Sequence, residues 1–224
     1  MKNIIFVHTE GSINSSCKPL LIPIGTTGLA NLLSKQGYQV EIIHVELEKQ
    51  LNNKFDIIKY LKFKNPALVC MDLHWHYHSF KVMKLAKKIK RKIKETRIII
   101  GGYTASYFAT EIINNYKFID FVIKGDAEIP ILKIAECINK TDDFRLVPNL
   151  IWRKKNYFYI KKSNVISNAQ TYIIDNKSCE SLSFSDFSLL KNNEYYKKIH
   201  FLSIFEKDIE KDLNIFYYNC GRGC

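Results

Sequence analysis

The chain has 224 residues and a formal net charge of +12 at pH 7, and 46% of its residues are hydrophobic and 13% aromatic. This apolar content suffices for a hydrophobic core and excludes wholesale disorder. No stretch reaches the roughly 18 apolar residues of a membrane helix, and the apolar start Ile4–Val7 is too short for a secretory signal. We therefore expect a cytoplasmic protein with no membrane partner.

The charge raises the alternative of an RNA-binding module. However, lysines are spread over most of the predicted helices, and no motif combines clustered aromatic and basic residues. The pattern favours a solvated basic surface, and a nucleic-acid partner is the weaker interpretation.

Short apolar runs alternate with segments of helical period along the first 140 residues. Strands are predicted at residues 4–7, 38–45, 66–72, 97–100 and 119–123, and helices around 29–33, 55–61, 79–94, 107–115 and 130–138. Such βαβ units imply a parallel sheet that is buried on both faces. The prediction is an α/β fold, a flavodoxin-like (Rossmann-like) doubly wound parallel five-stranded sheet, over residues 1–142. In this fold the first and third strands are neighbours.

The pattern changes in residues 143–224. Residues 149–153 and 157–160 flank Lys154-Lys155-Asn156, and this arrangement predicts a small hairpin. Periodicity is weak from residue 163 to residue 216, which predicts an irregular connector.

Ligands of open parallel sheets bind at the carboxyl ends of the strands, so the residues at and just beyond those ends are candidates. They are His8 and Thr9 after the first strand, Gly25 and Thr26 at the following helix, Asp72, His74, Trp75 and His76 after the third strand, Gly101, Gly102, Tyr103 and Thr104 after the fourth, and Gly125, Asp126 and Glu128 after the fifth. We expect them to share one rim.

Three histidines alternate after the third strand. On an extended segment His74, His76 and His78 point to one side, where they could bind a metal or face a cofactor. In the alternative, Trp75 and Tyr77 pack inward and the histidines point to solvent. The alternative is favoured over a zinc site.

Two other motifs each have two interpretations. Gly101-Gly102 either lets a bulky ligand approach the backbone or permits a positive φ in a turn. Asp126 and Glu128 flank the start of a helix, where carboxylates either cap the helix or bind sugar hydroxyls.

Cys220 and Cys224 have Cys-x3-Cys spacing. Closely spaced thiolates bind iron–sulfur clusters or zinc, although two cysteines cannot hold a four-iron cluster alone. Cys70 and Cys137 lie in apolar patterns and are predicted to be inert core thiols.

Five segments resemble, in order, the N-terminal half of cobalamin-dependent radical S-adenosylmethionine (SAM) enzymes. They are Pro23–Leu33 with Gly37–Val40, Pro66–Ser79, Ile100–Ala105, Asp120–Glu128 and Gly221–Cys224. In that family a flavodoxin-like cobalamin (vitamin B12) domain precedes a barrel whose Cys-x3-Cys-x2-Cys loop binds a [4Fe–4S] cluster. The resemblance implies cobalamin at the rim. The corrin then lies over the loops after strands one and three, and the nucleotide tail lies beside Gly101-Gly102 and the strand-five loop.

The resemblance also implies that Cys224, alone or with Cys220, is a cluster ligand. Because the sequence stops at Cys224, we expect a fragment that binds cobalamin and catalyses nothing by itself. The cluster and SAM would be used only in a complete parent chain, or with a barrel supplied in trans. That parent is expected to be a methyltransferase or another radical enzyme.

The chain differs from the wider group of cobalamin-binding proteins in one motif. This is the Asp-x-His-x-x-Gly signature, whose His binds cobalt from below. It should follow strand one, whereas Asp72-Leu73-His74 follows strand three and Tyr77 replaces the Gly. The ligand role is therefore not transferred to His74, but His74 and His76 remain candidates to face the lower side of cobalt.

A receiver-type signalling domain has a similar fold and is the rival interpretation. Asp72 and Lys124 occupy the places of its phosphoacceptor and its conserved lysine. A receiver also needs an acidic pair after strand one to hold Mg²⁺, where this chain has His8-Thr9-Glu10. The cobalamin interpretation is therefore favoured.

Overall fold

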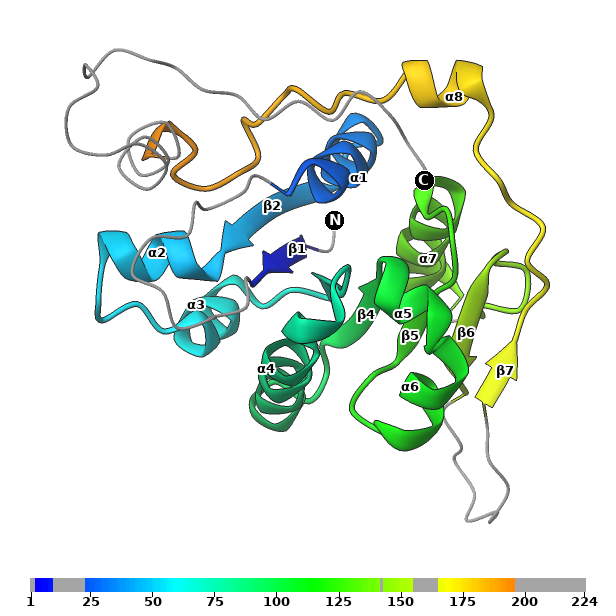
Figure 1. Ribbon diagram of the computed structural model, residues 1–224, viewed down its shortest axis with the longest axis horizontal. Coiled ribbons are helices and arrows are strands. Elements are labelled where there is room, and N and C mark those ends of the chain that lie inside the picture. Colours follow the sequence, from blue (N-terminus) through cyan, green and yellow to red (C-terminus); the bar gives the residue numbers. More distant parts are fainter. Residues whose placement is uncertain (1–2, 10–22, 142, 155–164, 196–224) are drawn as a thin grey trace.

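The computed structural model describes residues 3–9, 23–141, 143–154 and 165–195, and one seven-stranded sheet runs through them (Figure 1). In spatial order its strands are β2 (Gln39–His44), β1 (Asn3–His8), β3 (Leu68–Asp72), β4 (Arg97–Gly101), β5 (Phe121–Ile123), β6 (Leu150–Arg153) and β7 (Val165–Ser167). Strands β1 to β5 are parallel, whereas β6 and β7 are antiparallel to their neighbours. The five predicted strands and the pairing of β1 with β3 are confirmed.

The predicted hairpin is formed by β6 and β7, but β6 also pairs with β5 and so continues the main sheet. Its first strand agrees with the prediction. Its second strand is Val165–Ser167, and the predicted strand at residues 157–160 lies outside the described residues.

The helices follow the predicted order with three additions. They are α1 (Ile24–Lys35), α2 (Val45–Leu51), α3 (Ile57–Lys64), α4 (Ser79–Lys92), α5 (Tyr103–Tyr107), α6 (Ala109–Asn115), α7 (Glu128–Lys140) and α8 (Asn176–Glu180), with a 3-10 turn η1 (His76–His78) before α4. Helix α2 begins directly after β2 with no turn residue between them, so the sequence pattern did not reveal it. No helix in the described part of the chain is long and apolar enough to cross a membrane.

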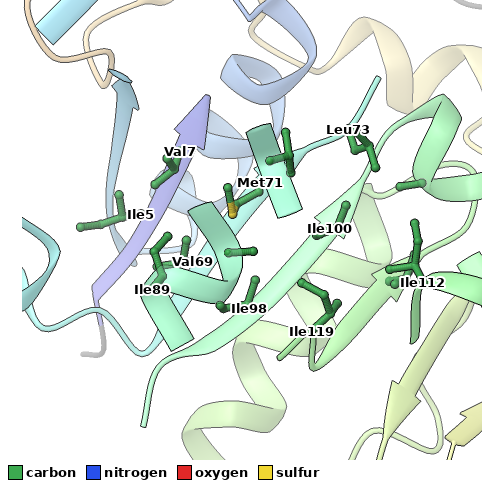
Figure 2. Packing of buried hydrophobic residues seen from close by; sticks show 14 of the residues in the cluster. Ile5, Val7, Val69, Met71, Leu73, Ile89, Ile98, Ile100, Ile112 and Ile119 are labelled. Atoms are coloured by element: carbon green, nitrogen blue, oxygen red, sulfur yellow. The ribbon is translucent and has the colours of Figure 1, made fainter. Parts of the chain in front are cut away.

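The sheet lies between two helical layers, with α1 and α7 on one face and α3, α4 and α6 on the other (Figure 1). Alternate residues of each strand point to opposite faces, so Ile4 joins the core under α1 and α7 while Ile5 joins the other core. Figure 2 shows the second core, in which Ile98 of β4 lies near Ile89 of α4. Burial of each such side chain contributes about 2 kcal/mol.

After β7 the chain passes α7, forms α8 and then crosses α1 to the opposite edge of the sheet (Figure 1). There Leu190 forms a parallel bridge with Ile42 of β2. The connector therefore contacts both edges of the sheet.

Candidate functional site at the carboxyl edge of the sheet

The ends of β1 and β3 meet because the strands are parallel neighbours, and this brings two predicted site residues together. His8, which is 8% exposed, lies with its Nδ1 2.9 Å from each carboxylate oxygen of Asp72. Burial would raise the pKa of Asp72, but the charge and hydrogen bond of His8 outweigh it and hold the pKa below its usual range. Asp72 is therefore an acceptor that fixes the orientation of the His8 ring.

A third polar residue, His44 at the end of β2, adjoins this pair. Its ring packs edge-on against His8 with 4.7 Å between centroids, and its Nε2 lies 3.7 Å from Glu46, which also pairs with Lys81 of α4. Burial, then the positive charges of His8 and Lys81, lower the pKa of His44 well below its usual value. His44 is therefore a neutral ring inside the fold.

The loop after β3 overturns the extended geometry expected for the histidine triplet and the inward packing of Trp75 and Tyr77. Residues 76–78 form the turn η1 instead of an extended segment, so the period of two is lost. His78 is buried, whereas Trp75 and Tyr77 are 53% and 49% exposed. The rings of Trp75 and Tyr77 stack with 6.4 Å between centroids, so aromatic faces are presented at the rim.

The loops after β3 and β4 are joined by hydrogen bonds. Leu73 N donates to Gly101 O at 2.7 Å, and the hydroxyl of Thr104 donates to His74 O at 2.9 Å. Gly102 has φ +106°, and a Cβ there would lie 2.9 Å from the Leu73 backbone. Gly102 therefore serves the turn, which is one of the two predicted roles of the glycine pair.

Gly101 differs from its neighbour. Apart from Gly101 and its two chain neighbours, no atom in the described part of the chain lies within 4 Å of the position that a Cβ would take there. Its surroundings match the other predicted role, close approach of a ligand to the backbone.

His74 completes an aromatic group at this rim. Its ring lies 4.6 Å from that of Tyr103 and 4.8 Å from that of Trp75, measured between centroids. Burial lowers the pKa of His74, and the opposing charge of Asp72 does not reverse this. The ring is therefore neutral near pH 7 and keeps a nitrogen lone pair.

The carboxylates beyond β5 are engaged within the fold. Asp126 Oδ2 accepts a hydrogen bond from Ile174 N at 2.9 Å, and Glu128 is 4% exposed in the first turn of α7. Gly125 has φ +84° and its N donates to the Ser106 hydroxyl at 2.9 Å. These contacts tie the loop to α5 and to the connector.

At the start of α1, Gly25 is exposed with no described atom within 4 Å of a Cβ position, and Thr26 is half-buried. Thr9 is 1% exposed, and its hydroxyl has no hydrogen-bond partner among the described residues. This edge therefore combines accessible backbone at Gly25 with a buried Thr9 hydroxyl that is available for a hydrogen bond.

Cys220 and Cys224 lie outside the described residues. Within the described ranges, no group of three or more His, Cys, Asp or Glu side chains is arranged to hold a metal ion. Cys70 is buried, and burial raises the pKa of its thiol, as expected for an inert core cysteine.

The family model for the B12 binding domain matches residues 13–135, which is more than half of the chain. The chain belongs to the B12-binding domain family. The match covers α1, the loops after β3, β4 and β5, and most of α7, and it favours the cobalamin interpretation over the receiver.

Known relatives of this B12-binding domain are longer proteins. It is 24% identical to a hopanoid C-3 methylase of Methylococcus capsulatus over 66% of this chain and 28% of that protein. It resembles the radical SAM methyltransferase TsrM of Kitasatospora setae, solved with cobalamin and a [4Fe–4S] cluster, with a TM-score of 0.62 and 15% identity over 80% of this chain and 30% of TsrM.

The cobalamin-dependent radical SAM enzyme OxsB, solved with aqua-cobalamin and SAM, gives a TM-score of 0.59 and 15% identity over 77% of this chain and 23% of OxsB. These structures show a shared fold. This chain spans less than a third of the length of each of these three proteins.

The residues at the rim fit a large planar cofactor with a polar tail. Trp75 and Tyr103 are more than half exposed, and the backbone at Gly25 and Gly101 is open. The buried Thr9 hydroxyl can still form a hydrogen bond. Apolar faces with a few placed polar groups are typical of cofactor sites.

Sequence reasoning missed the contribution of His44 to this edge. The register aligns His8 of β1 with His44 of β2, so each strand ends on a histidine at the same level. Counting from the predicted strand starts at residues 4 and 38 would instead place His8 opposite Ile42, so only the register of the structure reveals this alignment.

Proposed function

We propose that this domain binds cobalamin at the carboxyl edge of β1, β3 and β4 and serves as the cofactor module of a radical SAM enzyme. The observation that carries the proposal is the B12-binding family match over residues 13–135, whose rim loops are open at Gly101 and lined by exposed rings.

The corrin lies over the loops after β1 and β3 in this proposal. Trp75 and Tyr103 offer apolar faces, and Thr9, Gly25 and Thr26 border the same edge. His8 and Asp72 hold each other at 2.9 Å and keep the ends of β1 and β3 in place beneath the ring. Of the candidates for the lower side of cobalt, His74 has the stronger support, because its neutral ring is held between Trp75 and Tyr103, whereas His76 is exposed.

The nucleotide tail lies beside β4 and β5. The open side of Gly101 admits it, while Gly102 and Thr104 maintain the turn and Gly125 shapes the next loop. Asp126 and Glu128 remain candidates to meet sugar hydroxyls, with their present contacts keeping the loop in position.

Bound cobalamin supplies methyl transfer or radical chemistry. The residues of this domain bind the cofactor, orient it and limit the access of water. The reaction belongs to a radical SAM barrel, in a longer polypeptide or in trans. Cys224 and Cys220 are the proposed contribution to a [4Fe–4S] cluster in the complete enzyme.

The test is retention of the cofactor. Purified protein is mixed with hydroxocobalamin, free ligand is removed by gel filtration, and the visible spectrum is recorded. About one corrin per chain is expected. Absence of bound corrin, with phosphorylation of Asp72 by a small phosphodonor, would support the receiver instead, and salt-dependent binding of RNA without corrin would support the RNA-binding alternative.

A further inference from the structure

Helix α1 is buried on two sides, although a helix that packs only on a sheet buries a single stripe. Ala30 and Leu33 face the sheet and join the hydrophobic core. Gly28 and Asn31 are also buried, yet at 100° per residue they lie on the other side of the helix. The connector covers this second side.

The contacts of Asn31 and Gly28 require the connector. Asn31 is 4% exposed, and its Nδ2 donates to Ser183 O and Asp186 O, each at 2.8 Å. A Cβ on Gly28 would lie 2.5 Å from a ring carbon of Phe184. A buried amide without acceptors is unfavourable, so both residues suit a helix covered by residues 183–186.

The connector then adds to the edge of β2. Ile42 N donates to Leu189 O at 2.8 Å, and Lys191 N donates to Ile42 O at 3.0 Å. Leu190 is 1% exposed and packs in the core under α1. Since the bridge is parallel, this segment runs toward the same carboxyl edge as β2.

A third anchor lies on α2. Glu48 is 4% exposed, and its carboxylate bonds with the Lys191 ammonium and accepts from Asn192 Nδ2 at 2.6 Å. A buried carboxylate is tolerated only when it is paired. Residues on α1, β2 and α2 are therefore all matched to one short segment.

We propose that residues 183–192, here called the clamp, hold α1 in the position in which its first turn receives the cofactor. The inference rests on the proposed function, because Gly25 and Thr26 of that turn belong to the proposed cobalamin site. Gly28 lies within one turn of them on the same rigid helix. Docking of the clamp and binding of cobalamin are therefore coupled, and the coupling is reciprocal.

The first test is Asn31→Ala, with Asn139→Ala as the matched control. Asn139 is an exposed amide on α7 whose Nδ2 donates to Ala135 O of its own helix at 2.9 Å. Hydrogen exchange of residues 183–192 is followed by mass spectrometry, and the Kd for hydroxocobalamin is measured by equilibrium dialysis. Asn31→Ala is expected to speed exchange roughly tenfold and to raise the Kd about fivefold. The control is expected to change neither.

The second test uses the contact between Gly28 and Phe184 and holds even if Asn31→Ala fails to fold. Gly28→Ala should displace the ring and reproduce both effects of Asn31→Ala. In a Phe184→Ala background the added methyl has space, so Gly28→Ala should produce no further change in exchange.

The outcomes separate the two proposals. Slower exchange of residues 183–192 in wild-type protein on addition of hydroxocobalamin supports the coupling. Faster exchange in the variants with an unchanged Kd overturns the clamp alone, as does unchanged exchange. If the wild-type protein binds no cobalamin at all, the proposed function fails and the coupling fails with it.

Discussion

The two halves of the carboxyl edge are built differently. At the ends of β1 and β2, His8 and His44 are buried and meet Asp72 and Glu46. In the loops after β3 and β4, Trp75 and Tyr103 are more than half exposed. One half is closed by its own polar contacts, and the other presents apolar faces to solvent.

The difference separates residues that stabilise the fold from residues that we propose to contact the cofactor. Pairing of buried polar groups stabilises a fold, so the His8–Asp72 contact sets the positions of β1 and β3. Exposed aromatic rings add little to stability, but they gain binding energy when a ligand covers them. Loss of the His8–Asp72 contact should therefore lower stability, whereas loss of the exposed rings in the other half should weaken cobalamin binding and leave stability nearly unchanged.

The largest effect is expected at Gly102. Gly102→Ala forces a side chain into φ +106° and brings its Cβ to 2.9 Å from the Leu73 backbone. The free energy of unfolding should fall by about 3 kcal/mol, measured by urea denaturation. Gly101→Ala is the matched control and should change stability by less than about 0.5 kcal/mol, because its Cβ meets open space. Equal losses at both glycines would contradict the assignment of separate roles.

Asp72→Asn should lower stability at pH 7 by about 2 kcal/mol, because His8 loses a charged acceptor in a buried setting. The folded-state pKa of Asp72 is lowered, so its contribution is present above the unfolded pKa of about 3.9 and is lost as the pH falls. Urea midpoints between pH 7 and pH 3 should therefore drop less steeply in the variant. A variant curve parallel to the wild-type curve would show that the pair contributes nothing.

His44 should make the domain less stable in mild acid. Its pKa is lowered in the folded state, so the unfolded chain takes up a proton first as the pH falls below about 6.5. Stability should decline by up to about 1.4 kcal/mol per pH unit from this residue. His44→Leu should flatten the curve between pH 7.5 and pH 5.5, and an unchanged slope would mean that His44 is not the source.

The smallest effect on stability is expected at the exposed rings. Trp75→Ala should leave the melting temperature nearly unchanged, since the side chain is 53% exposed. It should weaken hydroxocobalamin binding about fivefold by removing an apolar face, which corresponds to about 1 kcal/mol. Tyr107→Ala removes a ring that is 81% exposed on α5 and should affect neither quantity. Equal cobalamin affinity in both variants would remove Trp75 from the site.

The sequence predicted the doubly wound fold because its strand signals are strong. Runs such as Ile98–Ile100 bounded by turn residues leave few alternatives to a buried parallel strand, and connection rules limit the strand order. Rim positions followed from the ends of those strands. This reasoning brought His8 and Asp72 to one edge before any contact was known.

Contacts over long sequence separations could not be predicted in this way. The turn η1 reverses the expected exposure of Trp75 and His78, because a 3-10 turn follows loop packing and not the period of a strand. The bonds of Asn31 to the connector join residues more than 150 positions apart. A single sequence with weak periodicity past residue 163 carries no signal for such pairs.

The most direct measurement is equilibrium dialysis of hydroxocobalamin against wild-type protein and a Gly101→Leu variant. The open space at Gly101 should accept a leucine without loss of stability, while the side chain blocks the proposed path of the nucleotide tail. We predict about one corrin per wild-type chain and at least tenfold weaker binding by the variant. No corrin on the wild-type chain, or equal affinity in both proteins at equal melting temperature, would contradict binding at this edge.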